Sequence, residues 1–288
     1  MWQFMKRGIV VAAGLVLTAS FSGDVHGLGD SLAVFRTAIL LGCGVVALIA
    51  WRWRVAQALI VACVLVGGLQ FVDGRFRMAP VGTDFVLYQK NLLYFERDRT
   101  AFVADVIASG ADVVTLQEVS RVNEAMLEQL RPQYPHQLFC NARNFRKNAV
   151  VSRTPLDAAD CDDHSGFARV VTQVRGRSVQ VYGLHLYWPY PYRQAEQVAQ
   201  MVPVLTAQNA PFSVVAGDFN MTPWGRGVAA IERATYTDRI GQAVWTYDLY
   251  GYPLAIDHIL ATGGVGTLEA RPMLGSDHRG LVARIDFP

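Results

Sequence analysis

From Phe85 onward the sequence predicts an α/β domain in which two mixed β-sheets pack face to face with helices outside. Short apolar runs alternate with amphipathic helical stretches, which predicts strands and helices in turn. Between residues 136 and 186 several strand-like runs follow one another without a helix, which is typical of hairpins. Ahead of this domain, residues 1–72 are apolar enough to predict a membrane region of about three helices.

Hydrophobic periodicity assigns the elements of the domain in order. Strands are expected where apolar residues alternate or form short buried runs, and helices where they recur every three or four positions. The expected strands are 85–93, 111–116, 136–140, 148–152, 168–174, 178–186, 212–216, 256–261 and 280–285, and the expected helices are 97–109, 122–130 and 193–205.

Three apolar stretches precede the domain, at about 8–21, 32–51 and 55–72. A bilayer core needs about 20 apolar residues per helix, within a range of roughly 17 to 25. The second stretch holds one charge, Arg36, near its end, and the third holds none. The first is shorter and also fits the core of a signal peptide. We expect it to be retained, because no good cleavage site precedes a mature domain.

Basic residues flank these spans unevenly. Lys6 and Arg7 precede the first span and Arg52 and Arg54 separate the second from the third, whereas the loop near SGDVHGLGD carries only acids and a histidine. Because basic loops stay in the cytoplasm, we expect a multi-pass protein of a bacterial-type inner membrane. The α/β domain then lies on its outer, periplasmic or extracellular side.

Residues 73–84 mix Gly, Pro and charge, which predicts a linker, and Arg75 and Arg77 within it oppose the outer placement mildly. The domain at 85–288 holds 19 Lys and Arg against 20 Asp and Glu, a net charge of −1. Proteins that bind nucleic acid non-specifically usually carry a basic face. The charge therefore disfavours such binding without excluding a local patch around residues 143–147.

Polar side chains accumulate where the predicted strands end. Each has an ordinary structural explanation alone, such as a turn Asp, a buried core His or a Glu favoured by a helix dipole. Four carboxylates at four strand ends, with two histidines and two carboxamides, are harder to explain unless those ends converge. The residues are Asn91, Glu118, His185, Asp218, Asn220, Asp257, Asp277 and His278.

This set suits metal-assisted attack of water on phosphorus. Mg²⁺ prefers oxygen ligands and uses one or two carboxylates together with substrate phosphate oxygens, and Mn²⁺ is the alternative cation. The sequence has no Cys/His cluster with zinc spacing and no G-x-x-x-x-G-K-[ST] motif. We therefore expect a Mg²⁺-dependent hydrolase of phosphodiester or phosphomonoester bonds.

Several short motifs, in this order and spacing, resemble the endonuclease/exonuclease/phosphatase superfamily, including its bacterial membrane-anchored members. They are KN at 90–91, LQEV at 116–119, NAVVSRTPL at 148–156, GLHL at 183–186, GDFN at 217–220, IDHIL at 256–260 and SDH at 276–278. The resemblance covers nearly all of 85–287 and implies a four-layer α/β sandwich with two central mixed β-sheets. Asn148 stands where a small residue often precedes the A-[IV]-[LV]-S-R segment.

The resemblance also implies roles for the matching residues. Glu118 would be the principal metal ligand, with Asn91 beside it helping to hold metal or phosphate. Asp277 would be a second carboxylate on the metal side.

The same resemblance implies the catalytic groups. Asp218 would orient or deprotonate the attacking water, and Asn220 would bind that water and a phosphate oxygen. His278 would act against the phosphate as acid, base or charge stabiliser, with Asp257 fixing its tautomer. His185 matches the histidine of the DNase, sphingomyelinase and phosphoinositide-phosphatase branches. His258 is expected to face the opposite side of its strand from Asp257 and to be structural, because strand side chains alternate.

An aromatic run, Tyr187 to Tyr192, follows His185 directly. Tyr187 and Trp188 are candidate substrate-binding residues, and core packing is the equally weighted alternative. Exposed rings beside a phosphate site could stack on unpaired bases or lie at a lipid interface. The short linker and the near-neutral charge favour a lipid headgroup or small phosphodiester over long duplex DNA.

Other functions stay open at this point. A membrane-tethered nuclease and a catalytically inactive scaffold of the same fold are the alternatives, although the intact polar set argues against the scaffold. A transporter or sensor is disfavoured because the spans lack paired charges. The sequence leaves the oligomeric state unknown.

Two cysteines lie in the domain, Cys140 and Cys161, and they fit an oxidising compartment. They flank the segment 148–156, so the strands that carry them could lie close enough for a disulfide. Free buried thiols are the alternative.

Overall fold

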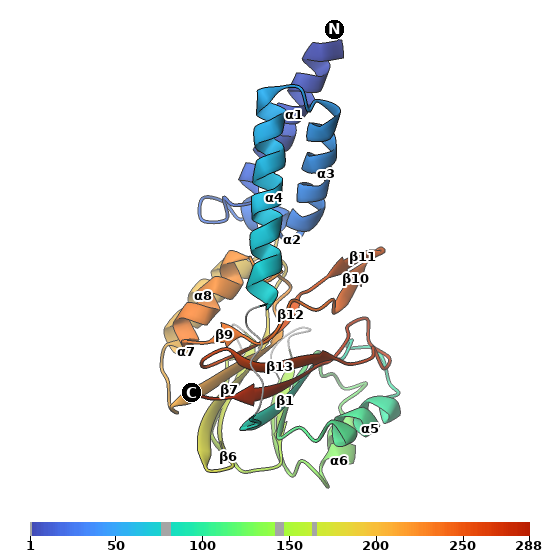
Figure 1. Ribbon diagram of the computed structural model, residues 1–288. Helices are drawn as coiled ribbons and strands as arrows, with labels where there is room; N and C mark the ends of the chain where they lie inside the picture. The colour runs from blue at the N-terminus through green and yellow to red at the C-terminus, as the bar shows by residue number, and fades with distance from the viewer. Residues whose placement is uncertain (1, 76–81, 142–146, 163–165) are drawn as a thin grey trace.

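The structure is a computed structural model that describes residues 2–75, 82–141, 147–162 and 166–288 (Figure 1). Part of the expected linker, residues 76–81, and most of the candidate basic patch, residues 142–146, lie outside the described residues. From Phe85 the chain forms two six-stranded sheets with helices on their outer faces, so the predicted α/β class with two mixed sheets is confirmed.

The first sheet has the strand order β13-β14-β1-β2-β4-β3. Its strands β1 and β2 are parallel, and the remaining pairs are antiparallel. Helices α5 (Thr100–Ser109) and α6 (Ala125–Leu130) accompany it. The strands are β1 (Phe85–Asn91), β2 (Val113–Gln117), β3 (His136–Cys140), β4 (Asn148–Ser152), β13 (Val265–Ala270) and β14 (Leu281–Asp286).

The second sheet has the order β5-β6-β7-β8-β12-β9, with β7 and β8 parallel and the other pairs antiparallel. Helices α7 (Gln194–Leu205) and α8 (Arg226–Thr235) accompany it. A separate hairpin joins β10 (Tyr247–Leu249) to β11 (Tyr252–Leu254). The sheet strands are β5 (Leu156–Asp162), β6 (Phe167–Val174), β7 (Arg177–His185), β8 (Phe212–Asp218), β9 (Asp238–Arg239) and β12 (Asp257–Ala261).

Three apolar clusters hold these layers together. The central one takes residues from both sheets, among them Leu87, Val150, Val181 and Ile259, and therefore lies between them. The second packs α5 and α6 on the first sheet, and the third packs α7 and α8 on the second. Because each sheet is covered on both faces, most of its central strands are buried throughout.

Four N-terminal helices precede the sheets: α1 (Trp2–Ala19), α2 (Leu28–Val34), α3 (Arg36–Ile49) and α4 (Arg54–Arg75). Among the described residues, one helix is long and apolar enough to cross a membrane, Arg54–Val72. A second qualifies if α2 and α3 are taken as one span, but they meet at a bend of 78°. The prediction of about three membrane helices is therefore not confirmed: the described residues give one candidate span, or two if the bent pair counts as one. The continuous helix expected over 32–51 is interrupted at Phe35, and the expected 8–21 span is not among the candidates.

The short helix α2 packs on the second sheet's helices and loops. Ala33 and Val34 belong to the apolar cluster under α7 and α8. The Ala33 carbonyl accepts hydrogen bonds from Trp224 Nε1 at 2.6 Å and from Thr222 Oγ1 at 3.2 Å. The Arg226 amide donates to Asp30 Oδ1 at 3.1 Å, which gives α8 a carboxylate partner at its first turn. The folded α/β unit therefore includes a segment from before the expected linker.

Sequence periodicity missed α8, β5, β9, β13 and the β10–β11 hairpin. The sequence of β5 is LDAADCD and much of the strand is exposed, so it lacks the apolar alternation that predicts a strand. It forms because β6 offers a free edge for backbone hydrogen bonds.

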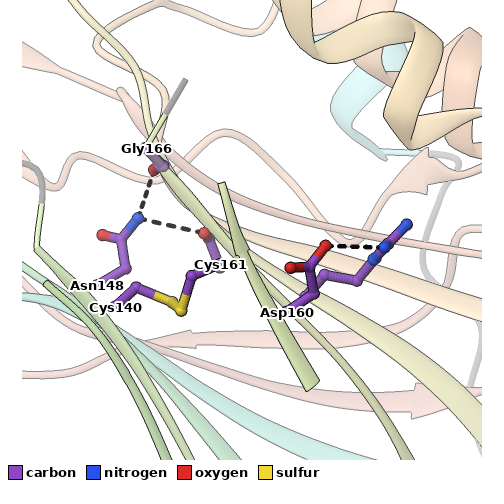
Figure 2. Close-up of a disulfide and its surroundings, with 7 residues drawn as sticks. Cys140, Asn148, Asp160, Cys161 and Gly166 are labelled. Atoms are coloured by element: carbon purple, nitrogen blue, oxygen red, sulfur yellow. Dashed lines mark hydrogen bonds and ion pairs between the residues drawn. A yellow bond between two sulfur atoms is a disulfide. The ribbon is translucent and has the colours of Figure 1, made fainter. Parts of the chain in front are cut away.

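Cys140 and Cys161 form a disulfide, with their Cα atoms 5.4 Å apart (Figure 2), so this prediction is confirmed. Cys140 lies on β3 and Cys161 on β5, the edge strands of different sheets. The bond therefore ties the two sheets together at one side of the sandwich. Asn148 makes a second cross-link there, because its Nδ2 donates to the Gly166 carbonyl at 2.5 Å. The side chain of Asn148, which replaces the small residue common at this position, thus makes a contact that a small residue could not make.

We predict that replacing both bonded cysteines with serine lowers the free energy of unfolding by about 3 kcal/mol. The disulfide closes a loop of 21 residues, and opening it restores chain entropy to the unfolded state. Denaturant unfolding of the detergent-solubilised chain measures the change. Cys43 and Cys63 stay in both proteins as an internal control, and equal midpoints for the two proteins would contradict the prediction.

Candidate active site

The predicted site residues come together at one edge of the sandwich. The carboxyl ends of parallel β1 and β2 meet there, as do those of β7 and β8. Strands β12 and β14 run antiparallel to their neighbours, so their amino ends lie at the same edge. This polarity places Asn91, Glu118, His185, Asp218, Asp257 and His278 close together although up to 187 residues separate them.

Most of these side chains line one cleft of about 400 Å³. Asn91 and Asp257 lie beneath them, bonded to cleft residues. The lining contains Glu118, His185, Asp218, Asn220, Asp277 and His278, together with Tyr94, Leu186, Tyr187, Trp188, Tyr192 and Tyr247.

Asn91 bridges the two carboxylates at the floor of the cleft. Its Nδ2 donates to Glu118 Oε1 at 3.1 Å and to Asp218 Oδ2 at 3.0 Å. Its Oδ1 accepts from the Leu93 amide at 3.0 Å, which fixes the orientation of the carboxamide. Because both of its donor hydrogens are occupied by acids, Asn91 holds two negative groups from different sheets side by side.

Glu118 follows β2 in a left-handed backbone conformation, with φ 58°. A non-glycine residue rarely adopts this conformation, and such positions are often functional. The conformation turns the carboxylate into the cleft, where Oε2 accepts from the Tyr94 amide at 3.0 Å. Burial raises the pKa of Glu118, and the neighbouring charge of Asp277 raises it further.

His278 and Asp257 form a buried pair. His278 Nδ1 lies 2.8 Å from Asp257 Oδ2, and Gln89 Nε2 donates to Asp257 Oδ1 at 2.8 Å. Burial alone would lower the pKa of His278, but Asp257 and Asp218 raise it to about 9. The pair therefore presents a cationic imidazole whose Nε2 faces the cleft.

Asp218 lies between the two histidines. Its Oδ2 is 3.6 Å from His185 Nε2 and 3.8 Å from His278 Nε2. Its Oδ1 accepts from the Asn220 amide at 2.8 Å, and Asn220 Nδ2 donates to the Leu186 carbonyl at 2.8 Å. Complete burial raises the pKa of Asp218. A carboxylate with a raised pKa in this place is suited to accept a proton from a bound water.

His258 lies outside the cleft. It is buried, its Nε2 donates to the Met221 carbonyl at 2.7 Å, and its ring packs against Phe219. This contact set agrees with the structural role expected from strand alternation. Tyr187 and Trp188 line the cleft, as a substrate-binding role requires, and their role stays a prediction.

Sequence reasoning missed Gln89 and Tyr247. Gln89 lies two residues before Asn91 on the same strand face, so alternation offered a signal for it. Tyr247 packs its ring 4.8 Å from the His278 ring and forms an isolated β-bridge with that residue. No motif or periodicity marks it, because it belongs to the hairpin that the sequence does not predict.

The donor set fits a Mg²⁺ ion on the Glu118 side of the cleft. Glu118 and Asp277 are carboxylates that line the same space, and their mutual repulsion calls for a cation. Asp218, Asp257 and His278 also offer ligand atoms within 4.8 Å of one another. We favour a proton-transfer role for that trio, because Asp257 already holds His278 and a cationic imidazole is a poor ligand for Mg²⁺.

The model of the Endonuclease/Exonuclease/phosphatase family matches residues 89–278, which include every polar residue of the cleft. The chain belongs to this family. Phosphoric ester hydrolysis is the chemistry of its nucleases and sphingomyelinases, which agrees with a cleft of acids and histidines. Comparison with curated proteins gives no match.

Solved structures share the family fold at low sequence identity. Beta toxin from Staphylococcus aureus with bound magnesium ions is 16% identical, with a TM-score of 0.55, covering 71% of this chain and 100% of the toxin. Sphingomyelinase C from Streptomyces griseocarneus is 19% identical, with a TM-score of 0.50, covering 72% and 100%. An AP endonuclease from Archaeoglobus fulgidus is 16% identical, with a TM-score of 0.54, covering 70% and 99%.

We predict that in the His258→Gln variant the free energy of unfolding decreases less at acidic pH than in the wild type. Burial lowers the pKa of His258 from 6.5 to about 4, so below pH 6.5 the unfolded chain takes up a proton that the folded chain does not. This loss of stability proceeds as the pH falls from 6.5 towards 4 and amounts to at most about 3 kcal/mol. Glutamine keeps a donor for Met221 but does not titrate.

The measurement is the free energy of unfolding at pH 7 and at pH 4.5 for the wild type and for the variant. A smaller acid-induced loss in the variant is expected. Parallel losses in the two proteins would contradict the assignment of a neutral, buried His258.

Proposed function

We propose that this protein is a membrane-anchored, Mg²⁺-dependent hydrolase of phosphate esters in which water attacks phosphorus. The observation that carries the proposal is the position of Asp218. Asp218 lies between His185 and His278 and is joined to Glu118 through Asn91. A proton acceptor (Asp218), a protonated imidazole (His278) and a carboxylate suited to bind metal (Glu118) therefore lie side by side.

Glu118 and Asp277 would hold the Mg²⁺ ion, with Asn91 fixing the position of Glu118. When bound, the ion neutralises phosphate charge and polarises the phosphorus–oxygen bonds. Mn²⁺, with similar ligand preferences, is the alternative. The beta toxin neighbour contains magnesium ions, which supports the choice of a divalent cation.

Asp218 and Asn220 act on the attacking water. Asp218 accepts one of its protons while the water oxygen bonds to phosphorus, and burial favours this proton uptake. Asn220 is anchored through its Nδ2 to the Leu186 carbonyl, which leaves its carboxamide oxygen to hold the water or a phosphate group. The ester bond from phosphorus to the leaving oxygen breaks, and the leaving oxygen takes up a proton.

His278 supplies positive charge to the phosphate and can give the proton to the leaving oxygen. Asp257 and Gln89 hold it in place, because Asp257 accepts from Nδ1 and Nε2 then carries the second proton. His185 adds a second imidazole on the other side of Asp218. Two histidines matter here because no Lys or Arg lines the cleft among the described residues.

The absence of Lys and Arg from the described lining also bears on the substrate. A long polyanion needs several cations along its path, whereas a single phosphate group needs only the ion and His278. The fold neighbours include a sphingomyelinase and an AP endonuclease, so the fold alone does not separate lipid from nucleic-acid substrates. We favour a lipid headgroup or a small phosphodiester, with membrane-tethered nuclease as the alternative.

We further propose a bacterial-type inner-membrane location with the catalytic domain on the outer side. Helices α1, α3 and α4 form a bundle that stands on the catalytic domain (Figure 1), with many large apolar side chains exposed. Arg7 lies over the Trp53 ring at 5.5 Å, so the basic N-terminus and the basic α3–α4 turn share the far end of the bundle. Basic residues at that end of the bundle and the disulfide in the α/β domain support an inside N-terminus.

We expect His278→Ala and Asp218→Asn each to lower turnover of a phosphodiester by about 10²-fold or more, because each removes a proton-transfer group. The assay is hydrolysis of bis(4-nitrophenyl) phosphate by the purified full chain with Mg²⁺, and then with EDTA. His136→Ala, on the edge strand β3, is the matched control. Near-normal turnover in either cleft variant would remove that residue from the mechanism, and full activity in EDTA would exclude the metal.

Glu118→Gln is expected to raise the Mg²⁺ concentration needed for half-maximal activity by roughly 10-fold, because the ion loses one anionic ligand. A Mg²⁺ titration of activity measures the shift. Glu128→Gln is the control, since Glu128 is an exposed carboxylate paired with Arg131. An unchanged Mg²⁺ requirement in Glu118→Gln would place the ion elsewhere.

A further inference from the structure

A second hollow of about 320 Å³ adjoins the catalytic cleft, and we call it the aromatic groove. One wall comes from the end of α2, with Val34 and Phe35. The other comes from the loop after β7, with Trp188 and Tyr192, and Leu249 of β10 lies beside them. A helix from before the expected linker thus forms part of a hollow next to the active site.

The groove and the cleft are continuous. Trp188, Tyr192 and Tyr247 line both of them. The Tyr247 ring lies 4.8 Å from the His278 ring and 6.1 Å from the Trp188 ring, so it stands at their junction. A molecule that binds its phosphate beside His278 therefore has an adjoining path along these rings.

The chemistry of the groove suits hydrocarbon. None of its described lining residues carries a charge. The hydroxyl of Ser31, the one small polar side chain among them, donates to the Tyr190 carbonyl at 2.5 Å and is therefore satisfied within the protein. A second phosphate group placed here would lose its hydration without gaining a cation, which costs several kcal/mol. A nucleic-acid strand therefore fits this path poorly.

The groove also lies at the base of the apolar helix bundle. Phe35 is the joint at which α2 bends by 78° into α3. On α3, Leu41, Val45 and Leu48 are exposed, as side chains that face lipid would be. In Figure 1, α2 lies between the bundle and the catalytic domain. A lipid at the surface of a bilayer around the bundle would meet this end of the groove.

We propose that the aromatic groove binds the hydrocarbon part of a bilayer phospholipid whose phosphate lies in the catalytic cleft. This assignment rests on the proposed phosphate-ester hydrolase and names its substrate class. Helix α2 is then part of the substrate site as well as a contact between the bundle and the domain. In the reaction, the water oxygen bonds to phosphorus, one phosphorus–oxygen ester bond breaks, and the leaving oxygen receives the proton.

The test compares two diesters with the same leaving group, methyl 4-nitrophenyl phosphate and octyl 4-nitrophenyl phosphate. The full chain in detergent with Mg²⁺ should show a kcat/KM at least about 10-fold higher for the octyl ester, because burial of each methylene is favourable. Leu249→Asp should reduce this octyl-to-methyl ratio at least about 5-fold, because a charge in the groove opposes hydrocarbon.

Tyr250→Asp is the matched control. Tyr250 is the next residue in the hairpin, its side chain is fully exposed, and it lines neither hollow. Its octyl-to-methyl ratio should equal that of the wild type. Phe35→Ser provides a second groove variant from a different element, and circular dichroism checks that each variant is folded.

A bilayer arm uses vesicles of phosphatidylethanolamine and phosphatidylglycerol. Release of water-soluble phosphate ester from the vesicles, slower in Leu249→Asp than in Tyr250→Asp, would support the proposal. Equal ratios in all four proteins, or plasmid cleavage without hydrolysis of vesicles, would overturn it while leaving the hydrolase intact. Failure to hydrolyse either diester, vesicles or DNA with Mg²⁺ would instead overturn the proposed function and this inference with it.

Discussion

The active site depends on the two sheets keeping a fixed relation to each other, because its central hydrogen bonds cross between them. Asn91 of the first sheet bonds to Asp218 of the second, and Gln89 of the first bonds to Asp257 of the second. His278, which precedes β14 of the first sheet, also bonds to Asp257. A small shift of one sheet would leave buried acids without partners, which is costly. The shared apolar core and the cross-sheet disulfide therefore help to keep the active-site residues of the two sheets in position, although both lie outside the cleft.

The electrostatics of the cleft follow from burial. Asp218 and Glu118 lie where water is scarce, and burial raises the pKa of both. The compensating positive charge within the described part of the cleft comes from His278, which Asp257 helps to keep protonated. Such a cleft has an excess of acid, and this excess suits a divalent cation bound together with a phosphate group. In the proposed mechanism the protein supplies orientation and proton transfer, and the ion would supply most of the charge neutralisation.

The N-terminal helices are structurally part of the catalytic unit. Helix α2 contributes Ala33 and Val34 to an apolar cluster of the domain, and Asp30 accepts from the first turn of α8. The same helix continues through Phe35 into the apolar bundle. Helix α2 therefore links the position of the apolar bundle to that of the cleft. Removing α2 would therefore expose part of the domain core.

The sequence alone determined the α/β class, most of the strands and the identities of the polar residues, because alternating apolar residues and short motifs such as GDFN are local. It also indicated that Cys140 and Cys161 could bond. Only the tertiary structure decided how these parts meet. Strand polarity brings the ends of six strands to one edge, and Gln89 and Tyr247 gain their places beside Asp257 and His278 from packing rather than from any motif. The bend at Phe35 likewise accompanies contacts of α2 with residues far away in the sequence, such as Trp224. Hydropathy along the chain cannot predict such contacts.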